Sequence, residues 1–275
     1  MPTLVTEQGI IHYEAYGRGR PVLLLHGWLN SWALWRNTIE VLGKEFRLYA
    51  LDFLGFGESG STNGRDEISS AYSVGNFILM VNQFMDRMGI IKAPLVGHSM
   101  GGTVALSVAV RHPEKVVKVI VIGSPMQGSS LSPLLKMAAY RGWIGLGKTT
   151  PLAYQVFQSG FRPFLRVYSH FLAHDGAMLG EMLTTDVAKL NAAPFFESVS
   201  TLRQTDIRPR LKELHMPVLG IYGKGDNIVS PGQGNVLKEY LPSSKIEWFE
   251  KSRHFPMLDE RDRFHASLRE FLNNG

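Results

Sequence analysis

The chain of 275 residues contains no cysteine. That absence excludes a disulfide framework, thiolate catalysis and metal sites built on cysteine ligands. Charged residues are also sparse, at 19% of the chain, and the 29 Lys and Arg residues are scattered along it. Because no basic run stands out, the net charge of +5 indicates a solvated surface rather than a nucleic-acid partner.

Long apolar runs are absent as well. No run approaches the roughly 20 residues that a helix needs to cross a bilayer. Residues 1–7 lack the basic segment and apolar stretch of a signal peptide. We therefore expect no membrane insertion and, by default, a cytoplasmic protein; the sequence does not indicate its oligomeric state.

What the sequence does contain is a series of short apolar runs bounded by glycine, proline or aspartate. They cover residues 22–25, 47–51, 93–97, 116–122 and 217–222. Runs of this length and composition are typical of strands that are buried on both faces, as in a parallel sheet. Residues 4–16, with Gly9 between two extended halves, resemble an antiparallel hairpin at the edge of that sheet.

Segments with helical spacing lie between the apolar runs. One apolar face, with residues three or four positions apart, is formed by Val74, Ile78, Val81, Met85 and Met88. Residues 34–42, 101–111 and 264–272 also fit helices. The alternation of strands and helices predicts an α/β fold with a mostly parallel sheet and right-handed crossovers.

One stretch, residues 129–205, breaks the alternation. It contains no convincing strand and is rich in Met, Phe and Tyr at helical spacing. Most of these side chains must simply pack between helices. Ligands in open α/β sheets bind beyond the carboxyl ends of the strands, so a late insertion is well placed to cover a pocket. We therefore predict a core of residues 1–128 and 206–275 and a helical cap of residues 129–205.

The sequence Gly97-His98-Ser99-Met100-Gly101 matches the pattern G-x-S-x-G. The match alone is weak evidence, because an ordinary turn with a capping serine could give it. Here a buried-strand pattern runs into the motif and a helix pattern runs out of it. A nucleophilic serine needs that sharp turn between strand and helix, with its hydroxyl projecting beyond the sheet. The context favours Ser99 as a nucleophile.

A serine hydroxyl needs a base within hydrogen-bond reach, and the base needs an orienting acid. In a fold of this kind the chain order is Ser, then Asp or Glu, then His. Of the three histidines after the insertion, His215 precedes a strand and His265 lies in a predicted helix, whereas His254 follows an extended run. Asp226 lies at the carboxyl end of the preceding strand. We predict His254 as base and Asp226 as its orienting acid, although Asp226 could equally be a polar turn residue.

An oxyanion hole needs two aligned donors. The first would be the backbone N–H of Met100, directly after the nucleophile. The second would be the backbone N–H of Trp28, in the loop His26-Gly27-Trp28 that follows an early strand. Gly27 would let this loop approach a substrate. His26 itself fits a structural hydrogen-bonding role better than a catalytic one.

These segments resemble the α/β-hydrolase superfamily, in the capped branch that contains small esterases and cofactor-free haloperoxidase-like enzymes. The resemblance covers nearly the whole chain and implies an α/β fold with a mostly parallel, eight-stranded sheet flanked by helices and a helical cap insertion. It implies that the loop after residue 51 braces the floor of the active site, and that no metal or organic cofactor is needed. The segments that carry it are His26-Gly27-Trp28, Asp52-Phe53-Leu54-Gly55-Phe56-Gly57-Glu58-Ser59, the serine motif extended to Gly102, Gly223-Lys224-Gly225-Asp226, and Ser252-Arg253-His254-Phe255-Pro256.

The expected activity is hydrolysis of small to medium apolar carboxylic esters through an acyl-enzyme. A hydrolase of C–C bonds, a lactonase, a perhydrolase and an amidase would use the same three residues, because fold and triad do not determine the substrate. Polar cap residues reaching the pocket would favour the C–C hydrolase. A receptor that binds a ligand without turning it over is an alternative of a different class.

Overall fold

The computed structural model describes residues 2–60, 71–139 and 151–274, so residues 140–150 of the predicted cap lie outside the described part of the chain. The described residues form one sheet of eight strands. In chain order the strands are β1 (Thr3–Val5), β2 (Ile10–Tyr16), β3 (Arg20–Leu25), β4 (Phe46–Leu51), β5 (Ala93–His98), β6 (Val116–Ile122), β7 (Val218–Gly223) and β8 (Lys245–Phe249).

The order of the strands across the sheet is β1-β2-β4-β3-β5-β6-β7-β8. β1 and β2 form an antiparallel hairpin, and β2 pairs antiparallel with β4. Every other pairing is parallel. The predicted fold class is therefore confirmed: the sheet is eight-stranded and mostly parallel, with the hairpin at its edge.

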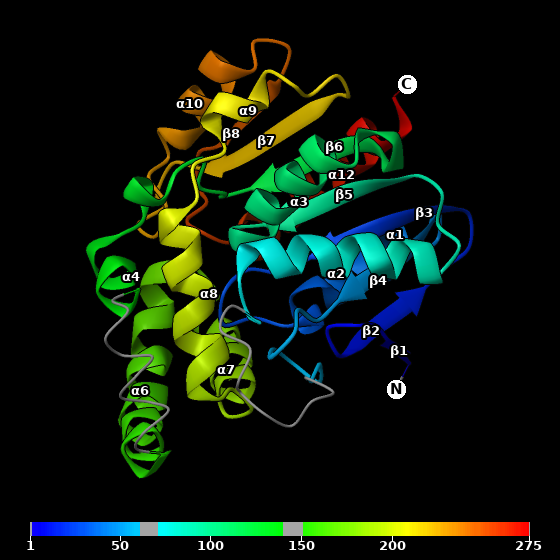
Figure 1. Ribbon diagram of the computed structural model, residues 1–275. Helices are drawn as coiled ribbons and strands as arrows, with labels where there is room; N and C mark the ends of the chain where they lie inside the picture. The colour runs from blue at the N-terminus through cyan, green and yellow to red at the C-terminus, as the bar shows by residue number, and fades with distance from the viewer. Residues whose placement is uncertain (1, 61–70, 140–150, 275) are drawn as a thin grey trace.

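Helices connect the strands and cover the sheet. α2 packs beside α3, and α1 packs beside α12. Figure 1 shows α2 and α3 in front of the sheet and α12 behind it. The helices outside the insertion are α1 (Arg36–Leu42), α2 (Val74–Arg87), α3 (Met100–Arg111), α9 (Arg208–Leu211), α10 (Gln233–Tyr240), α11 (Pro256–Asp259) and α12 (Arg261–Asn273).

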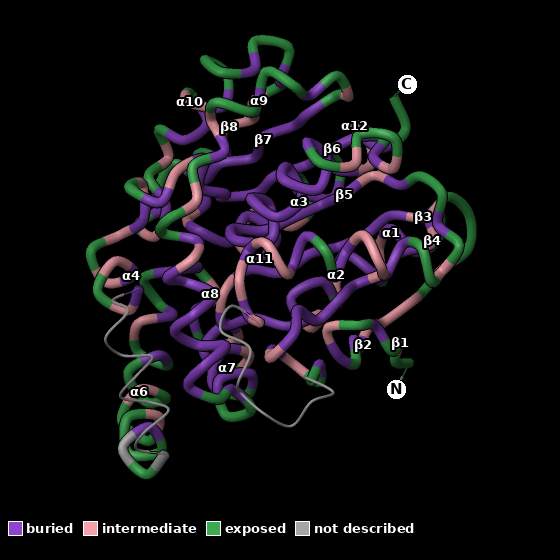
Figure 2. The backbone as a smooth tube through the Cα atoms, viewed as in Figure 1, coloured by how far each residue is buried: buried purple, intermediate pink, exposed green. Residues whose placement is uncertain are grey.

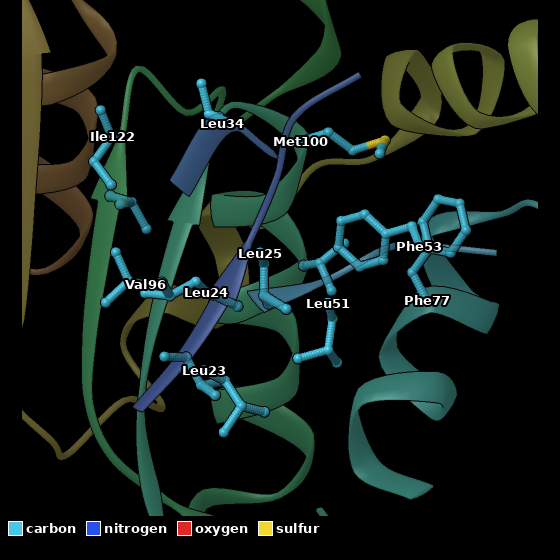
Figure 3. Close-up of a cluster of buried hydrophobic side chains, with 14 of the residues drawn as sticks. Leu23, Leu24, Leu25, Leu34, Leu51, Phe53, Phe77, Val96, Met100 and Ile122 are labelled. Atoms are coloured by element: carbon cyan, nitrogen blue, oxygen red, sulfur yellow. The ribbon is translucent and has the colours of Figure 1, made fainter. Parts of the chain in front are cut away.

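The hydrophobic core lies along the central strands. β3 lies between β4 and β5, and its successive residues Val22 to Leu25, which point alternately to the two faces of the sheet, are all buried. Figure 3 shows Leu23, Leu24 and Leu25 packed among side chains of neighbouring elements, such as Val96 and Leu51. Burial on both faces explains why β3 is an uninterrupted apolar run rather than an alternating one.

The pairing registers bring the carboxyl ends of these strands to one edge. Leu25 aligns with both Leu51 and Gly97, and His98 aligns with Ile122. The next strands continue the alignment, because Ile122 pairs with Ile221. The residues that follow each strand are thus collected at one edge of the sheet, which is where polar residues can meet.

Within residues 129–205, between β6 and β7, the described part of the chain forms four α-helices. Figure 1 shows them on the side to which the arrowheads of β5 and β7 point, and Figure 2 shows that α6 carries many exposed residues. The four helices are α4 (Pro133–Ala138), α6 (Pro151–Leu172), α7 (Gly176–Val187) and α8 (Ala192–Gln204). In the part of the chain that the structure describes, no helix is both long and apolar enough to span a membrane.

The two ends of this insertion are joined to each other. Gln127 and Asp206 form an isolated antiparallel bridge, and the Gly128 N–H donates to the Thr205 carbonyl at 3.0 Å. This closure supports a division of the chain into a core of residues 1–128 and 206–275 and a cap of residues 129–205. The cap and its boundaries stay a prediction.

A buried carboxyl lies where the insertion meets the core. Asp186, in α7, is 5% exposed and is hydrogen-bonded to the side chain of Ser31 in the loop after β3. Its Oδ2 atom is buried without a hydrogen-bond partner among the described residues. Burial is the main cause that raises the pKa of Asp186 to about 7, against an ordinary value of 3.8. Asp186 is therefore largely protonated below pH 7.

Replacing Asp186 with asparagine is expected to stabilise the protein at alkaline pH. The unfolded chain ionises Asp186 near pH 3.8, but the folded protein resists ionisation up to about pH 7. The protonated carboxyl of Asp186 contributes its full stability only below about pH 3.8, and that contribution is lost as the pH rises through about 7. An asparagine keeps the neutral shape at every pH, so we expect D186N to be more stable than wild type by about 1–3 kcal/mol at about pH 8.5.

Urea unfolding of both proteins between about pH 4.5 and 8.5 measures this difference. The gap between the two curves should widen with pH. Asp86→Asn is the matched control, since the Asp86 side chain is 56% exposed and paired with Lys115. Parallel curves for D186N and wild type would contradict the assigned protonation of Asp186.

Candidate active site

Ser99 lies in a sharp turn between β5 and α3. Its backbone has φ 52° and ψ −117°, a left-handed conformation that is strained for any residue other than glycine. Gly97 and Gly101 make this turn possible, because a Cβ on Gly97 would lie 2.3 Å from the Gly101 carbonyl oxygen, and one on Gly101 would lie 2.3 Å from that of Leu25. The motif glycines thus allow the close packing that projects Ser99 beyond the sheet.

Asp226 and His254 form a buried hydrogen bond. His254 Nδ1 lies 2.7 Å from Asp226 Oδ2, so the ring donates to the carboxylate from Nδ1. Asp226 Oδ1 accepts from the backbone N–H groups of Ile228 and Val229, at 2.8 and 2.9 Å. These two donors hold the carboxylate in place. Asp226 therefore does both things that the sequence allowed: Oδ1 accepts hydrogen bonds within a polar turn, and Oδ2 contacts His254.

Gly123, at the end of β6, leaves space for this pair. Its φ is 53°, and a Cβ at this position would come within 3.2 Å of His254 Nδ1 and 3.3 Å of Asp226 Oδ2. The end of β6 therefore supplies room rather than a carboxylate. This explains why Gly123 stands at a strand end where an acid could otherwise lie.

The backbone of His254 is held from two sides. His98 Nε2 donates to the His254 carbonyl oxygen at 2.9 Å, and the His254 N–H donates to the carbonyl oxygen of Leu172, the last residue of α6, at 3.1 Å. Burial, as the largest cause, and the neighbouring His254 hold the pKa of His98 well below its ordinary value. His98 is thus a neutral ring whose only proton lies on Nε2, and it ties the serine turn to the histidine loop.

Of the two predicted oxyanion donors, Met100 directly follows Ser99, and Trp28 follows Gly27, where a Cβ would lie 3.1 Å from the Ser99 Cβ. Trp28 follows β3 and Met100 begins α3, and within the described residues neither backbone N–H donates to another backbone carbonyl. His26 holds the Trp28 loop, because its Nδ1 donates to the Gly27 carbonyl at 2.7 Å and its Nε2 accepts from the Phe53 N–H at 3.0 Å. With both ring nitrogens occupied, His26 has a structural place in the loop.

The loop that begins at Asp52 is held by hydrogen bonds to the buried Asp52 carboxylate. Asp52 accepts from the Trp32 N–H at 2.6 Å, from the Glu58 N–H at 3.0 Å and from His12 Nδ1 at 2.8 Å. The hydrogen bond to Asp52 is the largest cause that raises the pKa of His12. All three donors are bonded to the Asp52 carboxylate, so the loop has a structural role.

A cavity of about 430 Å³ opens beside Ser99 and His254, and both residues line it. None of its described lining residues is a Lys, Arg, Asp or Glu. The insertion supplies most of the wall with aromatic and aliphatic side chains, and among its described lining residues the only polar side-chain groups are the hydroxyls of Tyr154 and Tyr168. The aromatic side chains from the insertion are Tyr154, Phe157, Phe161, Phe164, Tyr168, Phe195 and Phe196.

Among the described residues, no group of three or more His, Asp or Glu side chains is arranged to hold a metal ion. The expectation that no metal or cofactor takes part stays a prediction from the sequence. The structure brings Asp226 and His254 together and places Ser99, Trp28 and His254 in the wall of one cavity.

Three residues of this site were missed by the sequence argument. His98 and Gly123 contact the Asp226–His254 pair or its loop, and Asn30 lines the cavity two residues after Trp28. The only signal for His98 was its place inside the serine motif. Nothing in the pattern distinguished Asn30 from an ordinary loop asparagine, because its environment is set by packing.

The chain is similar to known proteins over most of its length. A family description for the alpha/beta hydrolase fold matches residues 20–261. A pimeloyl-[acyl-carrier protein] methyl ester esterase from Vibrio campbellii is 29% identical over 271 residues, which cover 95% of this chain and 98% of the relative. The similarity therefore extends over the insertion as well as the sheet.

Solved structures agree on the fold. An esterase from Exiguobacterium antarcticum has a TM-score of 0.78 at 21% identity and covers 97% of this chain and 96% of its own. A bromoperoxidase from Bacillus anthracis has a TM-score of 0.79 at 21% identity, with 97% and 96% covered. The resemblance to the α/β-hydrolase superfamily is confirmed by the family match, and these structures agree with it in fold.

Proposed function

This chain belongs to the alpha/beta hydrolase fold family and is a hydrolase of carboxylic esters, and from that premise we propose that Ser99, His254 and Asp226 perform the reaction on small to medium apolar esters. The observation that carries the proposal is the 2.7 Å hydrogen bond between His254 and Asp226, in a cavity that Ser99 also lines. The fixed Nδ1–H tautomer leaves His254 Nε2 as the basic atom.

The reaction follows from this arrangement. Ser99 Oγ attacks the ester carbonyl while His254 Nε2 takes its proton, and Asp226 stabilises the imidazolium that forms. The backbone N–H groups of Trp28 and Met100 receive the negative charge that develops on the carbonyl oxygen. His254 then gives its proton to the leaving alcohol. Water, activated by the same histidine, releases the acid from Ser99.

The cavity supports an apolar acyl or alcohol group. Its cap side is aromatic and aliphatic, which favours burial of methylene groups and offers no partner to a negative charge. The Vibrio relative is named for a methyl ester on a pimeloyl chain, and a chain of methylene groups suits this wall. The described cap residues that line the cavity carry no charge and only two hydroxyls, those of Tyr154 and Tyr168, and this largely apolar wall favours an ester over the substrate of a C–C hydrolase, for which more polar cap residues would be expected. A cytoplasmic location, the absence of a cofactor and the absence of a nucleic-acid partner remain proposals from the sequence.

Methyl esters of straight-chain acids are expected to become better substrates as the chain lengthens. Each buried methylene contributes about 0.8 kcal/mol, so kcat/KM should rise about fourfold per methylene until the cavity is filled. A matched pair tests the charge preference: methyl hexanoate should be turned over far faster than monomethyl adipate, whose far carboxylate would enter a wall without cations. Release of methanol gives both rates.

If kcat/KM is the same from methyl acetate to methyl octanoate, the cavity does not determine which chain length is preferred. Equal rates for methyl hexanoate and monomethyl adipate would show that the apolar cavity wall does not select against a charged substrate. Failure to hydrolyse any ester in the series would contradict the proposed function itself. A ligand-dependent rise in Tm without turnover would then favour the receptor alternative.

A further inference from the structure

The outer side of α6 carries large apolar side chains that are exposed to solvent. Single apolar residues scattered over a surface are normal, but a gathering of them on one element marks an interaction site. Figure 2 shows the exposed residues along this helix. Six apolar side chains of α6 are between 40% and 73% exposed, and we call them the outer stripe: Leu152, Val156, Phe157, Phe164, Val167 and Phe171.

Helical spacing keeps the outer stripe apart from the polar residues of α6. Each member of the stripe lies three, four or seven positions from another member, so the six share one side of the helix. The exposed surface of α6 is therefore divided into an apolar side and a polar, basic side. Four exposed polar residues form their own row at the same spacing: Gln155, Ser159, Arg162 and Arg166.

The outer stripe is continuous with the cavity wall. Phe157 and Phe164 belong to both, since they line the cavity and are 40% and 43% exposed. Each stacks on a neighbour that also lines the cavity: the ring centroids of Phe157 and Phe161 are 5.1 Å apart, and those of Phe164 and Tyr168 are 5.3 Å apart. An apolar surface thus runs from the outside of α6 into the candidate active site.

The charge around the outer stripe is positive. α6 contains no Asp or Glu, and its two arginines, Arg162 and Arg166, are exposed. In α4, the exposed Lys136 precedes Met137, which lines the cavity and is itself 61% exposed. An apolar stripe with basic residues beside it is typical of helices that lie in the interface of a membrane containing anionic lipids.

A lipid surface suits this helix better than a protein partner does. Protein interfaces carry roughly one hydrogen bond per 100–200 Å², and none of the six side chains of the outer stripe can donate or accept one. The helix also stands out from the insertion, since Figure 1 shows one end of α6 extending beyond α7 and α8. A bilayer interface receives such a projecting helix without requiring hydrogen bonds from its apolar side.

We propose that the outer stripe of α6 docks on an anionic lipid surface, and that the apolar ester passes from that surface into the cavity. The second half of this inference rests on the proposed esterase function. Docking buries the stripe at the boundary of the acyl chains, and Arg162 and Arg166 contact the headgroup phosphates. A contact of this kind lies on one face of the membrane and crosses no bilayer.

Co-sedimentation with vesicles tests the docking. The stripe variant L152Q/V156Q/V167Q changes three exposed side chains that do not line the cavity, and glutamine is a better helix former than valine. The variant should bind vesicles of equal parts phosphatidylcholine and phosphatidylglycerol at least about 10-fold more weakly than wild type, because three apolar side chains no longer enter the lipid.

Two further sets of variants separate the apolar and the charged contributions. The matched control V5Q/L79Q/I91Q removes three exposed aliphatic side chains from other parts of the surface and should bind like wild type. R162Q and R166Q should each weaken binding to the anionic vesicles by about fivefold. On vesicles of phosphatidylcholine alone, these two variants should not differ from wild type.

The supply of ester from the lipid has a separate readout. Wild type and the stripe variant should hydrolyse p-nitrophenyl butyrate in buffer at the same rate. With p-nitrophenyl decanoate dissolved in the anionic vesicles, and lipid so scarce that the rate follows the bound enzyme, the stripe variant should be at least about 10-fold slower. An unchanged rate on the decanoate would show that the ester does not pass through the docked state.

Equal vesicle binding by wild type and the stripe variant, or no binding by wild type, would overturn the docking. Sedimentation velocity and Tm then identify what covers the stripe: a dimer that the variant loses indicates a second copy, and a lowered Tm without lipid binding indicates the protein's own chain. Stripe-dependent binding without hydrolysis of either ester would leave the docking in place and overturn the esterase function.

Discussion

Replacing Ser99 with alanine is expected to lower kcat/KM for an apolar ester by roughly 10⁴-fold or more. The alanine has no atom that can attack the carbonyl, and without that bond His254 has no proton to accept and none to return to the alcohol. The cavity and the oxyanion donors stay in place, so substrate binding should change little. The loss should therefore be in kcat, measured with p-nitrophenyl butyrate.

The backbone of Ser99 provides a variant that separates catalysis from folding. Because Ser99 holds φ 52° and ψ −117°, a glycine at this position should relieve strain of about 1–3 kcal/mol. We expect S99G to be as inactive as S99A and to have a higher Tm than wild type. An inactive variant that is more stable than its parent cannot owe its inactivity to unfolding.

Ser243→Ala is the matched control, since Ser243 is exposed in the turn before β8, and it should be as active as wild type. A second readout is covalent: a p-nitrophenyl alkylphosphonate should add its phosphonyl mass to the peptide that contains Ser99 in wild type and S243A. Undiminished turnover by S99A would remove Ser99 from the mechanism. Labelling of S99A at the wild-type rate would point to another nucleophile.

Much of the fold follows from patterns that are local in the sequence. The runs that became β3 and β6 are apolar because both of their faces are covered, and the glycines around Ser99 are required by contacts within a few ångströms. The order of Ser99, Asp226 and His254 along the chain follows from the order of the strands that precede them. Such features leave direct traces in residue type and spacing.

The features that escaped the sequence depend on contacts between distant segments. His98 matters because its ring meets a carbonyl 156 residues further along the chain. The pKa of Asp186 is raised by burial against a loop near Ser31, which no local pattern of α7 reveals. Asn30 is notable because its buried side-chain oxygen accepts no hydrogen bond from any described residue. Unsatisfied atoms of that kind are defined by packing around them, and a sequence does not show packing.

Replacing Asp226 with asparagine is expected to lower kcat by about 10⁴-fold while leaving the geometry of the site intact. The reason is the tautomer of His254. In wild type the carboxylate accepts from His254 Nδ1, and the proton on Nδ1 leaves Nε2 free to accept the proton of Ser99. The asparagine amide can present either an oxygen or an NH₂ group to the ring, and the surroundings decide which.

The backbone donors of Ile228 and Val229 make that choice. They point at the position of Asp226 Oδ1, so the amide oxygen must lie there, because an NH₂ group would meet two donors. The NH₂ group is then directed at His254 Nδ1, which can only accept. The ring proton moves to Nε2, and His254 can no longer act as base toward Ser99.

Two measurements check this chain of events. Turnover of p-nitrophenyl butyrate gives the loss of kcat, with Asp86→Asn as an exposed acid-to-amide control that should retain full activity. ¹⁵N NMR of labelled histidine reports the tautomer directly: the His254 proton should lie on Nδ1 in wild type and on Nε2 in D226N. A variant that keeps more than about a tenth of the activity, or that keeps its proton on Nδ1, would show that Asp226 does not orient the base through this hydrogen bond.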